Sequence, residues 1–139
     1  MKFKNLVFTV LFVLLSQVAQ GEIAVVVHPS NSASTLDAAT IQLLFLGKLN
    51  AFPDGQKSIP LSLSDSHPIR LEFNSSVLKK TEGQYKAFWS KMMFTGKGIP
   101  PKEQPSGKEI LDLVSKNPNM IGYMDASEVD GSVKVVAKF

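Results

Sequence analysis

The chain has 139 residues, 44% hydrophobic and 19% charged, with 15 Lys and Arg against 12 Asp and Glu and no cysteine. This length suits one domain with one core, and the missing cysteine excludes disulfides and thiolate chemistry. The basic residues are scattered, with Lys79 and Lys80 the only adjacent pair. This pattern excludes the basic stripe of a nucleic-acid-binding surface.

Residues 1–21 have the pattern of a cleavable signal peptide. A short basic start precedes residues 6–15, which are apolar except for one threonine. The small residues Ala19 and Gly21 fit the −3 and −1 positions, which predicts cleavage before Glu22. A cut after Ala19 is the alternative.

A membrane anchor is the other interpretation of this segment. A spanning helix needs about 20 apolar residues, and the polar Ser16 and Gln17 end the run too early. We therefore expect residues 22–139 to be a periplasmic domain that is not embedded in the membrane. Without Lys2 and Lys4, 13 basic residues face 12 acidic ones, so the mature chain is nearly neutral.

The mature chain begins with a predicted strand and helix. Residues 23–27 are a continuous apolar, largely β-branched run, which is typical of a strand buried on both faces. Residues 28–34 form a polar turn. Ser34 and Asp37 then resemble a capping box at the start of a helix that ends near residue 46.

A second strand and two helices follow. Residues 58–63 predict the strand, and Pro68 suits the first turn of the next helix because proline lacks an N–H. Thr81 and Gln84 form a capping box for the third helix. Its apolar residues recur at helical spacing, which predicts core packing rather than a cofactor site; they are Tyr85, Phe88, Trp89, Met92 and Met93.

The last part of the chain predicts one more helix and two strands. Residues 97–105 contain three prolines and predict an extended connection. A helix is expected over residues 106–116, with strands over 120–124 and 133–137. The resulting order, β-α-β-α-α-α-β-β, predicts a single three-layer α/β domain with a mixed sheet.

The first candidate binding site is the loop after the first strand, with Ser30, Asn31 and Ser32. Ligands of open α/β sheets bind beyond the carboxyl ends of the strands, and a Ser/Asn-rich loop before a helix can bind an anion. The alternative is that these residues only turn the chain and cap the helix.

The second candidate is the turn after the second predicted strand, with Ser64, Ser66 and Arg70. Arg70 falls in the first turn of a helix, where the helix dipole disfavours a cation. A bound oxyanion would offset that cost and suit the guanidinium. The alternative is a surface ion pair with Asp65 or Glu72.

The two histidines, His28 and His67, both stand beside proline in predicted strand-end loops. Together with Asp65 or Ser66 they suggest a hydrolytic or metal site, but no hydrolase or metal-binding motif accompanies them. We therefore expect ordinary loop histidines, no enzyme, and no metal or cofactor.

Several stretches together resemble a known family. The most specific combination is FLGK at 45–48 with IGY at 121–123. The other similar stretches are residues 22–31, 40–44, 52–55, 59–61, 70–73, 94–98, 117–120 and 132–136. The chain is similar in these stretches to the substrate-binding components of phosphate-specific ABC transporters, over nearly all of residues 22–138.

The resemblance implies a type II periplasmic-binding-protein-like fold and a small, phosphate-like anion as ligand, with an ABC permease or a membrane sensor as partner. Carried over from the family, the ligand-binding residues are Ser30, Asn31, Ser32, Ser64, Ser66 and Arg70. No cofactor is implied.

The chain departs from the family in one turn and in length. Where the family has a glycine-rich turn, this chain has residues 66–69, Ser-His-Pro-Ile, whose bulk and proline remove N–H donors near an anion. A two-domain binding protein also needs about twice this length. The expected function is binding of phosphate or a related oxyanion for an ABC transporter or a sensor; the alternative is docking to a membrane sensor or transporter without a ligand.

Overall fold

The computed structural model describes residues 21–139, so residues 1–20 of the predicted signal peptide lie outside the described part. Within the described part, no helix is both long and apolar enough to cross a membrane. The elements in chain order are β1 (Ile23–Val27), α1 (Ala38–Phe45), β2 (Ile59–Leu63), α2 (Pro68–Ser76), α3 (Glu82–Phe94), β3 (Lys102–Gln104), α4 (Gly107–Lys116), β4 (Met120–Asp125), the 3-10 helix η1 (Ala126–Glu128) and β5 (Lys134–Lys138).

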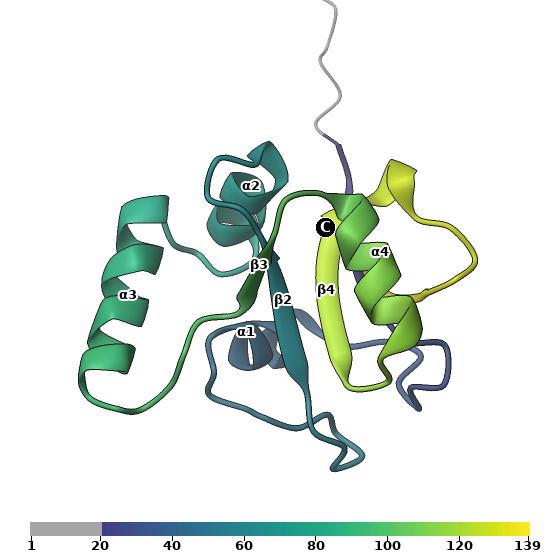
Figure 1. Cartoon of the computed structure of the whole chain (residues 1–139), viewed down its shortest axis with the longest axis horizontal. Coiled ribbons are helices and arrows are strands. Elements are labelled where there is room, and N and C mark those ends of the chain that lie inside the picture. The colour runs from purple at the N-terminus through teal and green to yellow at the C-terminus, as the bar shows by residue number, and fades with distance from the viewer. Residues whose placement is uncertain (1–20) are drawn as a thin grey trace, which may run out of the picture.

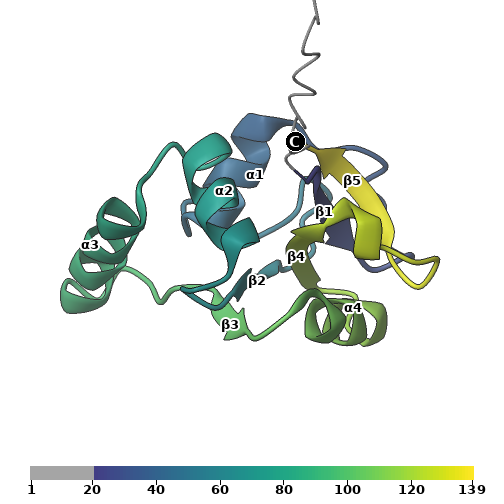
Figure 2. The same cartoon turned by 90° about the horizontal axis from the view of Figure 1, so that it is seen from above.

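Five strands form one mixed sheet in the order β3-β2-β4-β1-β5 (Figures 1 and 2). Strand β2 runs parallel to β3 and β4, whereas β1 runs antiparallel to both β4 and β5. All five residues of β1 are buried. The prediction of a first strand covered on both faces is therefore confirmed.

Helices cover both faces of the sheet, as Figure 2 shows. Adjacent residues of β4 point to opposite faces. Gly122 lies under Ile110 and Val114 of α4, whereas the next residue, Tyr123, packs against aromatic rings from α1 and α2. The predicted three-layer α/β domain with a mixed sheet is confirmed.

The helix starts follow capping chemistry. Asp37 caps α1, because its carboxylate accepts a 2.7 Å hydrogen bond from Thr40 N. Ser34, the other residue of the expected capping box, lies before this cap. The predicted capping box of α3 is present, with Thr81 and Gln84 each accepting from the other's backbone N–H.

Strand β3 lies inside the segment that the sequence predicts as an extended connection. Its residues Lys102, Glu103 and Gln104 pair in parallel with Leu61 and its neighbours in β2. The strand has three polar residues and no apolar alternation, so periodicity gives no signal for it.

Helix α3 lies at the side of the molecule, away from the main body of the sheet (Figure 1). Tyr85 and Trp89 are buried, but Met93 is 49% exposed and Phe94 is 93% exposed. The expectation that the whole apolar stripe packs in the core is therefore right for the buried residues and wrong for Met93. The reason is that only one side of α3 is covered.

Three aromatic rings form the centre of the α1–α2 layer. Tyr123 stacks on Phe73 with ring centroids 3.8 Å apart, and Phe45 meets both rings edge-on. The Tyr123 hydroxyl lies 3.0 Å from Ser62 Oγ and accepts a hydrogen bond from Leu63 N at 3.2 Å. Burial raises the pKa of Tyr123 to about 12.

Replacing Gly47 by alanine should destabilise the fold more than the same change at Gly96. Both glycines end a helix with φ near +70°, so each alanine pays about 1 kcal/mol of backbone strain. At Gly47 the new Cβ would also lie 2.9 Å from Trp89 Cη2, whereas nothing lies within 4 Å at Gly96. Urea unfolding should show an extra loss of about 1–3 kcal/mol for Gly47→Ala; equal losses would contradict the contact.

Tyr123→Phe should remove part of the alkaline sensitivity of the fold. A phenol with a folded pKa near 12 and an ordinary value of 10.0 stabilises the fold below pH 10 and loses that contribution as the pH rises through 12. At pH 8 the wild type should be more stable by about 1–2 kcal/mol, because the variant leaves Leu63 N–H unpaired. This advantage should shrink towards pH 12 in urea unfolding, and a constant advantage would contradict the shifted pKa.

Candidate functional site

The two loops with the predicted binding residues lie at opposite ends of the sheet. In the register, Val27 at the end of β1 and Pro60 near the start of β2 both pair with Ile121. The loop after β1 therefore lies beside the start of β2, while the turn after β2 lies at the other end. The structure does not bring these loops together, so their residues do not line one common site.

The loop after β1 uses its polar groups within the protein. Ser30 Oγ lies 2.7 Å from His28 Nδ1, and Ser32 donates a 2.7 Å hydrogen bond to Asp54. Asn31 is buried, its side-chain oxygen accepts from Ala33 N, and its carbonyl oxygen accepts from a lysine Nζ.

Charge also weakens this loop as an anion site. The hydrogen bond from Ser32 is the main cause that lowers the pKa of Asp54 below its ordinary value. Asp54 therefore stays ionised at neutral pH and would repel an anion beside Ser32.

The turn before α2 is capped by a side chain of the chain itself. His67 Nδ1 accepts from Ile69 N at 3.1 Å, and His67 O accepts from Arg70 N and Leu71 N. Pro68 has no N–H to offer. The first backbone donors of α2 are thus occupied or missing, so the start of this helix offers no free N–H group to an anion.

The serines of this turn are more accessible than its backbone. Ser66 is exposed and Ser64 is half-buried. Neither hydroxyl makes a hydrogen bond to another residue in the 21–139 range, whereas Ser64 N donates to Gln104 O. Both hydroxyls therefore remain open to a ligand.

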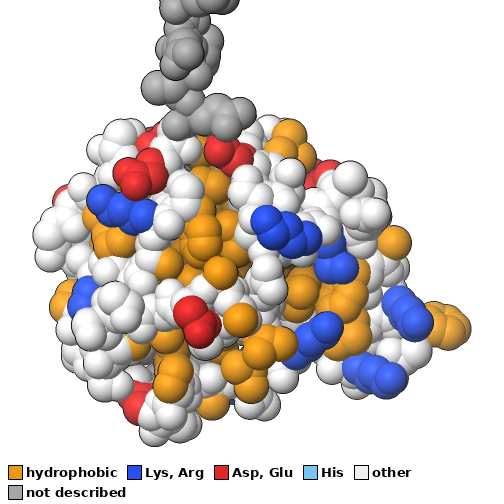
Figure 3. All heavy atoms as spheres, turned by 180° about the vertical axis from the view of Figure 1, so that it is seen from behind, with side chains coloured by type: hydrophobic (Ala, Val, Ile, Leu, Met, Phe, Trp, Pro, Cys, Tyr) orange, Lys and Arg blue, Asp and Glu red, His pale blue; other side chains and the backbone are white. Residues whose placement is uncertain are grey.

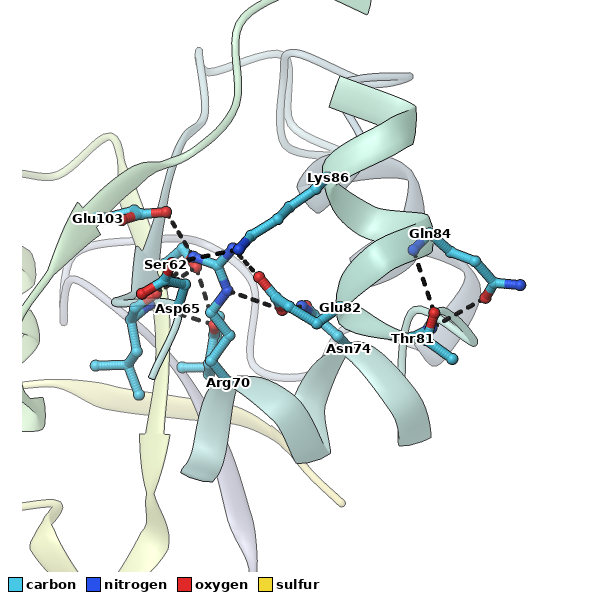
Figure 4. Close-up of polar contacts among 11 residues, drawn as sticks. Ser62, Asp65, Arg70, Asn74, Thr81, Glu82, Gln84, Lys86 and Glu103 are labelled. Carbon is cyan, nitrogen blue, oxygen red and sulfur yellow. Dashed lines mark hydrogen bonds and ion pairs between the residues drawn. The ribbon is translucent and has the colours of Figure 1, made fainter. Parts of the chain in front are cut away.

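Arg70 is buried at the junction of four elements (Figure 4). Its side chain is 2% exposed and forms 2.6 Å ion pairs with Glu82 of α3 and Glu103 of β3. Arg70 Nη1 also donates to Leu63 O at 3.1 Å, and the guanidinium lies 4.8 Å from the ring centroid of Tyr85.

We call Arg70, Asn74, Glu82 and Glu103 the Arg70 cluster, and further hydrogen bonds connect them. Arg70 Nε donates to Glu82 Oε2 at 3.3 Å, and the buried Asn74 Nδ2 donates to the same oxygen at 3.0 Å. Burial by itself would lower the pKa of Arg70, but the hydrogen bonds to Glu82 and Glu103 outweigh it and raise the pKa above its ordinary value. One cation therefore faces two carboxylates, and the cluster carries excess negative charge.

The partners of Arg70 differ from those that the sequence suggests. Asp65 instead pairs with Lys86 at 3.4 Å on the surface. In place of the expected surface pair, the buried Arg70 pairs with Glu82, which is 20% exposed, and with Glu103, which is 53% exposed. Glu82 and Glu103 are 12 and 33 residues from Arg70. No local spacing rule links residues so far apart, so no sequence pattern points to Glu82 or Glu103 as partners of Arg70.

The two histidines also lie apart, since His28 follows β1 and His67 precedes α2. Each accepts a hydrogen bond from a backbone N–H two residues further along the chain. Among the described residues, no group of three His, Asp or Glu side chains is arranged to hold a metal ion.

No protein-family model matches the chain. No curated protein matches it either. Solved structures do match in fold, and each comparison covers 84% of this chain.

One is described as a phosphate ABC transporter substrate-binding protein with bound phosphate, from Clostridium perfringens, with 24% identity, a TM-score of 0.67 and 45% of its own length covered. Another is an ABC-type phosphate transport receptor from Vibrio cholerae, with 18% identity, a TM-score of 0.65 and 46% covered. A third is PstS from Borrelia burgdorferi, with 14% identity, a TM-score of 0.62 and 47% covered.

The chain spans less than half the length of each of these structures. At these identities the similarity is one of fold. The described domain therefore has the architecture of about one half of a phosphate ABC transporter substrate-binding protein.

Proposed function

We propose that the mature chain is a periplasmic accessory protein that docks to a membrane sensor or transporter and holds no free anion. The observation that carries this proposal is the pairing of Arg70, the one arginine of the chain. Its guanidinium is buried and forms ion pairs with Glu82 and Glu103, so it stabilises the fold and is not free to bind an anion.

The α2 turn supports the same conclusion. An anion at a helix start is stabilised by free backbone N–H groups and by nearby positive charge. Here His67 occupies the N–H of Ile69, and Pro68 has none. The neighbouring Arg70 cluster is negative, so a phosphate ion would gain little there.

Binding of phosphate or a related oxyanion, for an ABC transporter or a sensor, is the second candidate. It is supported by the similarity to a protein solved with bound phosphate. The open hydroxyls of Ser64 and Ser66 are the groups that would serve it; Ser30, Asn31 and Ser32 would form a separate site at the other end of the sheet.

The purified mature chain, residues 22–139, should bind spheroplasts of the source organism saturably, and protease treatment of the spheroplasts should abolish this binding. A labelled chain in a sedimentation assay measures it, with lipid vesicles as the control without protein. Binding to lipid vesicles alone, or no saturable binding, would contradict docking to a membrane protein.

Calorimetry on the same sample tests the second candidate, phosphate binding. We expect no saturable heat with phosphate or sulfate up to about millimolar concentration. A dissociation constant of about 1 mM corresponds to a binding free energy of about −4 kcal/mol. Saturable phosphate binding that is lost in Ser64→Ala/Ser66→Ala, but kept in Ser30→Ala/Ser32→Ala, would favour phosphate binding at the α2 turn.

Arg70→Met should destabilise the fold by about 2–3 kcal/mol, mainly because Glu82, which is 20% exposed, would lose its cation, whereas Glu103 is 53% exposed and stays hydrated. Lys86→Met, which breaks only the exposed pair with Asp65, should cost less than about 1 kcal/mol. Adding Glu82→Gln to Arg70→Met should recover part of the loss. Urea unfolding measures all three, and a harmless Arg70→Met would contradict the structural role of Arg70.

A further inference from the structure

A groove lies at the opposite end of β2 from the α2 turn. Its walls come from the end of α1, the start of β2, α3 and residues 99–101, and it has a volume of about 450 Å³. We call it the Trp89 groove after the side chain that forms its α3 wall. This volume falls within the range of about 300–1,000 Å³ that small-molecule sites have.

The walls of the Trp89 groove are mostly apolar. Leu44, Leu49, Ile59 and Trp89 contribute side chains, and Ile99 is 81% exposed beside them. In Figure 3 the α3 side of the molecule lies to the right, where exposed hydrophobic side chains lie among Lys and Arg side chains. An apolar concavity of this kind gains free energy when an apolar group displaces its water.

The charges at the groove are of one sign. Lys57 and Lys102 line it, and no Asp or Glu is among the described residues that do so. Neither lysine forms an ion pair with another residue of the 21–139 segment. Two free ammonium groups at an apolar concavity complement a ligand with an anionic head.

The groove wall also contains a polar group without a protein partner. Ser58 is 6% exposed and lines the groove, and its Oγ makes no hydrogen bond. Buried hydroxyls almost always have a partner. An unpaired hydroxyl in the wall between Lys57 and Ile59 is a third group that a polar head could engage.

We propose that the Trp89 groove binds a small amphipathic carboxylate, with its apolar chain or ring against Trp89 and Ile99 and its carboxylate at Lys57 and Lys102. Inorganic phosphate would not use the apolar walls. The concave shape, the unpaired hydroxyl and the two lysines favour this occupant over a second copy of the chain or a partner helix. The inference is independent of the docking role.

The experiment uses the fluorescence of Trp89, which is the single tryptophan of the chain. Decanoate, kept below its critical micelle concentration, should change the emission saturably with a dissociation constant of roughly 0.1 mM. Decanol and decyltrimethylammonium should bind at least about tenfold more weakly, because they lack the anionic head. Phosphate should leave the emission unchanged.

Variants test the two halves of the site separately. Lys57→Glu/Lys102→Glu should weaken decanoate binding at least about tenfold, whereas Lys138→Glu on β5 should leave it unchanged. Ile99→Ser, at an exposed position, should weaken decanoate and decanol alike. Circular dichroism confirms that each variant is folded.

Three results would overturn the inference: no saturable emission change with decanoate, equal affinity for decyltrimethylammonium, or unchanged affinity in the double lysine variant. Analytical ultracentrifugation supplies a fourth test, since a stable dimer whose assembly is broken by Ile99→Ser would assign the groove to a second copy. None of these results bears on the spheroplast binding that tests the docking role.

Discussion

The guanidinium of Arg70 connects α2, where it originates, to carboxylates from α3 and β3 and to the carbonyl at the end of β2. Helix α3 lies to one side of the domain and buries only one of its sides, and β3 pairs with β2 over three residues. Because buried charges are costly without partners, the ion pairs form only when all four elements are in place. The cluster thus couples the outer part of the domain to the sheet.

This coupling also decides what the α2 turn can do. An arginine near a helix start can donate its N–H groups to a bound anion or to oxygen atoms of the protein, but the same groups cannot do both at once. In this chain four donor contacts of Arg70 go to protein oxygens. A lobe with the architecture of a phosphate-binding protein therefore has an arginine whose side-chain donors are bound within the protein, which is why we assign its function to surfaces rather than to an enclosed ion.

Much of the fold follows from local rules, and the site does not. Three elements are predicted by signals that lie within a few residues of them. These signals are the apolar run at residues 23–27 for β1, Pro68 for α2 and the Thr81–Gln84 capping box for α3. The direction of β1 has no such local cause, since the antiparallel pairing with β4 is set by residues almost 100 positions away. The same holds for Glu82 and Glu103. The separation of the two serine loops therefore could not be read from the chain.

The edge strands limit how another chain can attach to this domain. Strand β3 offers only three residues, two of them the exposed and charged Lys102 and Glu103, and β5 begins and ends with lysine at the opposite edge. Short, charged edges resist pairing with further strands. We therefore expect partners to contact side chains on the faces of this domain rather than to add a strand to its sheet.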